Sequence, residues 1–264
     1  MSKNNISKKL SKIYVSAAEK NTSPKRTIGN TYGLNQRFLN SISPPFAYIL
    51  NRLNISADLV TIISFVFLIL GSIYFVLGNS LFGSVIWFIA AFLDSLDGCI
   101  ARLSKKNTIY GTTLDSFGSD IFYFTFPFVV GAYLFIYTDH KLIFFSEFDI
   151  LIISFIISFT LIGYRIIGLQ RYVLFLREKK LRKIKREKKF LEIKKTYNMI
   201  DHEAIRMNFF SEPGIILNIL IISVLQNDKL FFYYLIIISI YTSLRFLTSI
   251  IATYISFRKM NNLS

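Results

Sequence analysis

The chain has 264 residues, of which 53% are apolar, and a formal net charge of +15 from 31 basic and 16 acidic residues. Few soluble domains are both so apolar and so basic, so we expect these two properties to be separated along the chain. The single cysteine, Cys99, excludes an intrachain disulfide framework and a zinc ribbon, and His140 and His202 are too far apart in sequence to suggest a metal cluster. The positive charge alone would fit a nucleic-acid-binding protein, so the position of the basic residues along the chain matters.

The N-terminal segment is polar and basic as far as residue 31 and has no apolar core of the signal-peptide kind. Over residues 34–53, apolar side chains recur at roughly helical spacing on both sides of Pro44-Pro45. This pattern predicts a short helix that lies in the membrane interface; an ordinary linker is the alternative. We expect residues 1–57 to form a cytoplasmic and interfacial segment.

The rest of the chain, residues 58–264, contains six long apolar blocks. A helix needs roughly 20 apolar residues to cross the hydrocarbon core of a bilayer. The fifth block is the weakest, because Glu212 and Pro213 lie in its first turns. We expect an all-α integral membrane protein with six transmembrane helices, at residues 59–77, 81–100, 110–137, 150–175, 209–225 and 230–257.

The basic residues predict the orientation of these spans. Twelve Lys and Arg lie in the linker 177–206, which we expect to extend the fourth helix into water; nine precede residue 58, three lie in 102–106 and two follow the last span. Cytoplasmic flanks of membrane helices carry excess Lys and Arg, so we expect both termini in the cytoplasm and the protein in the cytoplasmic membrane. The net charge then reflects topology and attraction to anionic lipids, and no nucleic-acid partner is expected.

Four carboxylates lie near the cytoplasmic ends of the second and third spans. A charge costs about 2.5–3.5 kcal/mol at the centre of a membrane helix, so such residues are functional candidates. Facing carboxylates repel one another unless cations lie between them, and Mg²⁺ or Mn²⁺ suits oxygen ligands. Interhelical ion pairs and a proton or cation pathway are the alternatives. The four residues are Asp94, Asp97, Asp115 and Asp120.

Small and basic residues accompany these carboxylates. At about 100° per residue, Asp94, Asp97, Gly98 and Ala101 share one helix face. Gly111, Asp115 and Ser119 form a matching stripe on the next helix, and small residues let helix backbones approach closely. A metal ion held by carboxylates commonly binds substrate phosphates. The basic residues that we expect to contact the same phosphates are Arg102, Lys105 and, in the fourth span, Arg165.

The spacing of these residues resembles the signature of the CDP-alcohol phosphotransferases (CDP-alcohol phosphatidyltransferases), Asp-x2-Asp-Gly-x2-Ala-Arg-x8-Gly-x3-Asp-x3-Asp. The start of the first span, from Ser56 to Thr61, is also similar to the family's Thr-Pro-Asn-x-x-Thr, with Ala57 and Asp58 in place of Pro and Asn. Seven of the eight fixed positions of the signature are matched with the same gaps, by Asp94, Asp97, Gly98, Ala101, Arg102, Gly111 and Asp115.

The resemblance implies a six-span enzyme in which an acceptor hydroxyl attacks the β-phosphorus of a CDP-linked donor and CMP leaves. It implies that Asp94, Asp97 and Asp115 bind two Mg²⁺ or Mn²⁺ ions, and that Gly98 and Gly111 leave room for the cytidine. The donor is CDP-diacylglycerol or another CDP-alcohol, the acceptor is not identified, and a homodimer is implied by the family alone. The residues expected to bind the donor are Asp94, Gly98, Ala101, Arg102, Lys105, Gly111 and Arg165.

The eighth position departs from the family, because Ser119 replaces the Asp that serves as metal ligand and proposed base, and Asp120 follows it. In a regular helix Asp120 lies about 140° from Asp115, and a serine hydroxyl is no base at neutral pH. Ser119 and Asp120 are the candidate catalytic residues. Three interpretations stay open. A helix irregularity near Gly118 turns Asp120 inward as fourth ligand and base, the acceptor needs no Asp base, or the protein is an altered or inactive homologue that binds CDP-alcohol as a partner or regulator.

Overall fold

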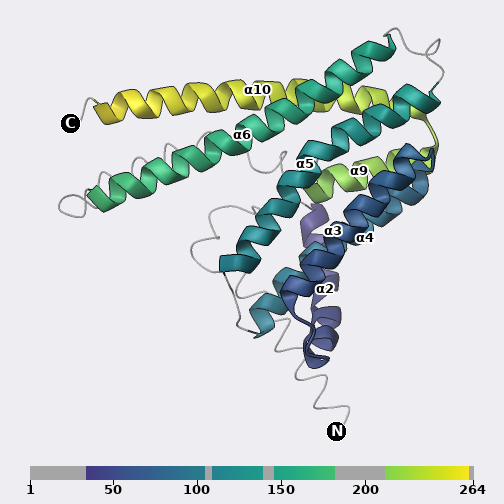
Figure 1. The fold of residues 1–264 in the computed structure, drawn as a ribbon, viewed down its shortest axis with the longest axis horizontal. Coiled ribbons are helices and arrows are strands. Elements are labelled where there is room, and N and C mark those ends of the chain that lie inside the picture. Colours follow the sequence, from purple (N-terminus) through teal and green to yellow (C-terminus); the bar gives the residue numbers. More distant parts are fainter. Residues whose placement is uncertain (1–33, 105–108, 139–145, 182–211, 262–264) are drawn as a thin grey trace. The chain divides into compact units, whose positions relative to one another are not determined.

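The computed structural model describes residues 34–104, 109–138, 146–181 and 212–261, and within these ranges all regular secondary structure is α-helical (Figure 1). The prediction of an all-α fold is confirmed for this part of the chain. The helices are α2 (Leu34–Arg52), α3 (Ala57–Val76), α4 (Ser80–Ser104), α5 (Ile109–Tyr137), α6 (Glu147–Leu181), α9 (Glu212–Leu225) and α10 (Asp228–Asn261).

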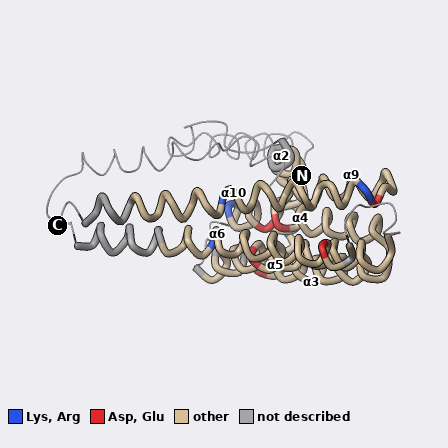
Figure 2. The backbone as a smooth tube through the Cα atoms, turned by 90° about the horizontal axis from the view of Figure 1, so that it is seen from above, with Lys and Arg blue, Asp and Glu red and all other residues tan. Residues whose placement is uncertain are grey.

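Five of these helices are long and apolar enough to cross a membrane, and they coincide with the first four and the sixth of the predicted spans. Lys, Arg, Asp and Glu are sparse along the parts of the helices that Figure 2 colours by residue type. The fifth predicted span is the shorter apolar helix Pro213–Leu225 within α9, which at 1.5 Å per residue rises only about 20 Å, less than the roughly 30 Å of a hydrocarbon core. The five long segments are Ala57–Val76, Ser80–Ser104, Ser116–Tyr137, Phe148–Gln170 and Asp228–Ile255.

Helix α2 continues through Pro44 and Pro45, so the prolines do not interrupt the predicted N-terminal helix. Each proline lacks the N–H that would bond the carbonyl four residues earlier. Nearby, the Ser43 hydroxyl donates to the carbonyl of Leu39 at 2.6 Å. The helix is therefore confirmed, whereas its position in the membrane interface stays a prediction.

The first turn of α3 is fixed by residues at its start. The Ser56 side chain accepts a hydrogen bond from the backbone N–H of Leu59 at 3.2 Å, and Asp58 places a carboxylate at the positive end of the helix dipole. The family's usual Pro and Asn are thus replaced by residues that also start a helix well. This capped end is where α3 approaches the carboxylates of α4.

The chain forms two compact units. The first comprises, among the described helices, α2, α3, α4, α9 and α5 as far as Phe122; the second comprises α5 from Tyr123, α6 and α10. In the second unit α6 and α10 pack side by side (Figure 1), and the Thr160 hydroxyl donates to that of Thr242 at 2.9 Å. The fourth predicted span extends as a helix to Leu181, and the remainder of the basic linker 177–206 lies outside the described residues.

Two glycines bring α3 and α4 together in the first unit. A Cβ on Gly83 would lie 2.8 Å from the Gly71 carbonyl oxygen and would collide with the Phe75 ring. That ring stacks on Trp87 with centroids 4.6 Å apart, and the Trp87 indole N–H donates to the carbonyl of Leu68 at 3.0 Å. The pair of glycines therefore allows the short distance between α3 and α4 at which Phe75 and Trp87 pack against each other.

We predict that Gly83→Ala destabilises the protein by about 1–3 kcal/mol, because an overpacked core forces backbone shifts. Thermal unfolding in detergent provides the measurement. Gly168→Ala is the matched control, since its added Cβ meets no heavy atom within 4 Å and alanine is the better helix former. A Gly83→Ala protein that melts at the wild-type temperature would contradict this account of the α3–α4 contact.

Candidate functional site

Asp97 is the buried carboxylate of the motif, with a relative exposure of 6% on α4. Asp94, one turn earlier, is half-buried. The i, i+3 spacing places both on one face of a helix, and the unbroken α-helix of residues 80–104 realises the predicted arrangement. An ionised carboxylate inside a protein requires hydrogen bonds or opposite charge to remain there.

Thr61 on α3 supplies such a hydrogen bond. Its Oγ1 hydroxyl donates to Oδ2 of Asp97, and the threonine is itself only 3% exposed. The sequence predicted Asp97 but not this partner. Thr61 is the last residue of the segment that is similar to the family's Thr-Pro-Asn-x-x-Thr, and that similarity was the available signal.

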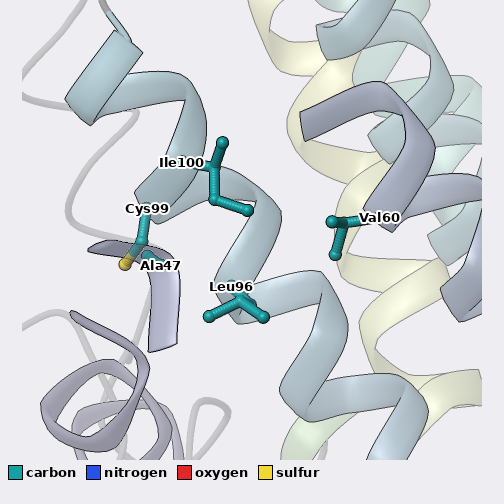
Figure 3. Close-up of a cluster of buried hydrophobic side chains, with 5 residues drawn as sticks. All are labelled: Ala47, Val60, Leu96, Cys99 and Ile100. Atoms are coloured by element: carbon teal, nitrogen blue, oxygen red, sulfur yellow. The ribbon is translucent and has the colours of Figure 1, made fainter. Parts of the chain in front are cut away.

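Apolar side chains pack next to this polar pair. Val60, Leu96 and Ile100 are almost fully buried, and in Figure 3 Leu96 and Ile100 extend toward Val60, while Cys99 lies beside Ala47 of α2. Val60 precedes Thr61 and Leu96 precedes Asp97, so the apolar contact and the polar contact use consecutive residues of the same two helices. The cluster thereby sets the register in which Thr61 meets Asp97.

Arg102 lies over Gly98. A Cβ on Gly98 would be 3.2 Å from Nη1 of Arg102, and Nη2 of Arg102 donates to the Cys99 sulfur at 3.0 Å. We expected Gly98 to leave room for a cytidine. In the structure the room is taken by the guanidinium, which is the end of a flexible side chain and can turn toward a phosphate.

The α5 half of the motif lies on a regular helix. Residues 109–137 are α-helical throughout, so the helix irregularity near Gly118, which was one of the three open interpretations, is absent there. Gly118 instead accommodates a neighbouring ring, because a Cβ at this position would collide with Phe65 of α3. Ser119 is half-buried and Asp120 is exposed, which leaves Ser119 on the helix face of Asp115. The side chain of Asp115 and residue Lys105 lie outside the described part.

Among the described side chains, no group of three His, Cys, Asp or Glu lies close enough together to hold a metal ion. Asp94 and Asp97 are described, whereas the third expected ligand, the Asp115 side chain, is not. The donor set of the motif consists of carboxylate oxygens, and this chemistry fits Mg²⁺ or Mn²⁺. A buried Asp97 with a fixed orientation is consistent with such a ligand.

The second unit contains two membrane arginines with tyrosine partners that the sequence did not predict. Arg165 lies over the Tyr123 ring at 5.3 Å. Arg245 donates to the hydroxyls of Tyr164 at 2.7 Å and Tyr241 at 3.2 Å, and its guanidinium lies 4.4 Å from the centroid of the Tyr164 ring. These contacts lower the cost of a cation within a span.

Comparison with known proteins identifies the family. Residues 54–192 match the sequence profile of the CDP-alcohol phosphatidyltransferases. The chain is also similar to archaetidylinositol phosphate synthase of Pyrococcus horikoshii, with 40% identity over 67 residues, which cover 25% of this chain and 36% of that protein. The similarity to this relative thus spans about a third of its length. The profile match covers more than half of the chain and includes the whole aspartate motif, so the chain is an integral membrane protein of the CDP-alcohol phosphatidyltransferase family.

Proposed function

We propose that this protein transfers a phospho-alcohol group of the phosphatidyl type from a CDP-linked donor to an acceptor hydroxyl and releases CMP, in the synthesis of phospholipids or related membrane glycoconjugates. The observation that carries the proposal is the motif on α4 and α5, in which the carboxylate of Asp97 is buried and held by Thr61. Family membership and the archaeal relative support the reaction class.

In this proposal Asp94, Asp97 and Asp115 hold two divalent ions, Mg²⁺ or Mn²⁺. The ions, when bound, polarise the pyrophosphate and stabilise the charge on the departing CMP. The role of the buried Asp97 is to present a carboxylate of fixed orientation, and that of Asp94 is to add a second one from the same helix face.

The donor is bound by residues around these carboxylates. Arg102 leaves Cys99 and contacts a phosphate, which clears the space over Gly98 for the nucleotide. Ala101 and Gly111 keep the neighbouring surface free of bulky side chains. Lys105 and Arg165 are the further basic residues that we propose for the donor phosphates.

The regular course of α5 favours Ser119 over Asp120 at the acceptor end of the site. Ser119 lies on the helix face of Asp115 and can orient the acceptor hydroxyl by a hydrogen bond, although it cannot act as a base. Asp120 as fourth metal ligand and base is the competing assignment, which requires a distortion that the described helix does not have.

The donor is CDP-diacylglycerol or another CDP-alcohol. The archaeal relative is named for the synthesis of archaetidylinositol phosphate, which makes a phosphorylated inositol the first acceptor to test. The alternative function, a homologue that binds CDP-alcohol without turnover as a partner or regulator, rests on Ser119 alone. Binding of donor and metal without CMP release would favour it.

We further propose that the protein has six membrane spans, with α9 as the short fifth span. We also propose that it lies in the cytoplasmic membrane with both termini in the cytoplasm. The support is the charge distribution, because only Lys141 and Lys229 fall on the opposite side in this arrangement. The basic cytoplasmic face then attracts anionic lipids. A homodimer is proposed from the family alone.

We predict that Asp97→Asn lowers CMP release from a CDP-alcohol by at least about a hundredfold, because it replaces a charged metal ligand with a neutral amide that binds hard cations poorly. Purified protein with Mn²⁺ is assayed for CMP. Asp149→Asn, which changes a carboxylate at the start of α6, is the matched control and should keep most of the activity. Wild-type turnover by the Asp97→Asn protein would show that Asp97 is not a metal ligand of the site.

The acceptor end is tested by comparing Asp120→Ala with Ser119→Ala. We expect Asp120→Ala to change the transfer rate less than about threefold, and Ser119→Ala to lower it by about tenfold, the cost of one lost hydrogen bond of about 1.4 kcal/mol. Transfer and donor hydrolysis are measured separately. Loss of transfer in Asp120→Ala with unchanged Ser119→Ala would assign the base to Asp120 instead.

A further inference from the structure

We propose that Thr61 is a positioning residue for the metal-binding carboxylate of Asp97, acting through its hydroxyl and not through its bulk. This inference rests on the proposed metal-dependent transfer and names a residue outside the aspartate motif that the reaction depends on. It starts from one observation, the hydrogen bond from Thr61 Oγ1 on α3 to Asp97 Oδ2 on α4.

The hydroxyl of Thr61 has one proton and two acceptors within reach. One acceptor is the Ala57 carbonyl at 3.1 Å, one turn earlier in α3, and the other is Asp97. A hydrogen bond to a carboxylate is roughly twice as strong as one to a neutral acceptor. The proton therefore belongs to the bond with Asp97, and the carbonyl contact holds the Thr61 oxygen in place.

The surroundings allow little movement of either side chain. Thr61 and Asp97 are 3% and 6% exposed, and a β-branched threonine has a restricted χ1 angle in a helix. Next to them, Val60 and Leu96 pack in the buried apolar cluster (Figure 3). A hydroxyl fixed in this way determines which way the plane of the Asp97 carboxylate is turned.

A second hydroxyl ties the same turn of α4 to another helix. The hydroxyls of Ser43 on α2 and of Ser95 form a hydrogen bond with their oxygens 3.0 Å apart, and Ser95 lies between Asp94 and Asp97. Outer partners of this kind orient metal ligands, and their removal typically weakens metal affinity by about 10- to 100-fold. Thr61 bonds a carboxylate of the motif directly, so we expect its removal to lower the metal affinity.

The experiment titrates purified protein in detergent with Mn²⁺, without nucleotide, and reads free Mn²⁺ by electron paramagnetic resonance. We expect Thr61→Val to raise the Mn²⁺ dissociation constant by about tenfold, and Thr61→Ser, which keeps the hydroxyl, to stay within about twofold of wild type. The matched control is Thr253→Val, because within the described residues the Thr253 hydroxyl bonds a carbonyl of its own helix, that of Ser249 at 2.7 Å. It should leave Mn²⁺ affinity unchanged.

Because the lost hydroxyl weakens metal binding, we expect a matching effect in turnover assays. Thr61→Val should raise the Mn²⁺ concentration needed for half-maximal CMP release much more than it lowers kcat at saturating Mn²⁺. Wild-type Mn²⁺ affinity in Thr61→Val would overturn the inference, as would equal weakening in Thr61→Ser. If the wild-type protein itself binds no Mn²⁺, the proposed metal-dependent function fails, which is a separate result. Melting temperatures are measured for every variant, and Thr61→Ala replaces Thr61→Val if the latter does not fold.

Discussion

A carboxylate buried among membrane helices is the constraint on which the first unit of this protein depends. Asp97 is almost fully removed from solvent, and an unpaired charge in such a place is strongly unfavourable. The hydrogen bond from Thr61 lowers the free-energy cost of burying this charge, and a bound cation would lower it further. A protein that keeps an ionisable group at this position gives up stability there, and the simplest physical reason is that the group has a chemical task.

The packing of α3 against α4 makes this pair of side chains meet. Toward the far ends of the two helices, Gly71 and Gly83 allow a close approach that Trp87 and Phe75 fill. Near the motif, Val60 and Leu96 continue the contact with aliphatic side chains. The register is thus set over the length of the two helices, and Thr61 reaches Asp97 as a consequence of it.

Much of the architecture could be predicted from the sequence, because membrane spans depend on apolar length and the aspartate motif depends on spacing. The partners of the key residues could not, since they depend on which helix faces meet. Thr61 beside Asp97, Arg102 folded over Gly98 and the tyrosines around Arg245 belong to this class. A helix irregularity at Gly118 was one of the open interpretations of the sequence. In the structure the helix is regular there, and close packing against Phe65 accounts for the glycine.

The central claim is that the carboxylates of α4 and α5 perform metal-dependent transfer from a CDP-alcohol. The most direct measurement incubates the purified wild-type protein with a panel of CDP-alcohols, including CDP-diacylglycerol, and quantifies CMP with and without Mg²⁺ or Mn²⁺. The account predicts CMP release from at least one donor, its loss when the metal is chelated, and its return when the metal is restored. Turnover that is indifferent to chelation, or binding of every donor with no CMP from any of them, would contradict it.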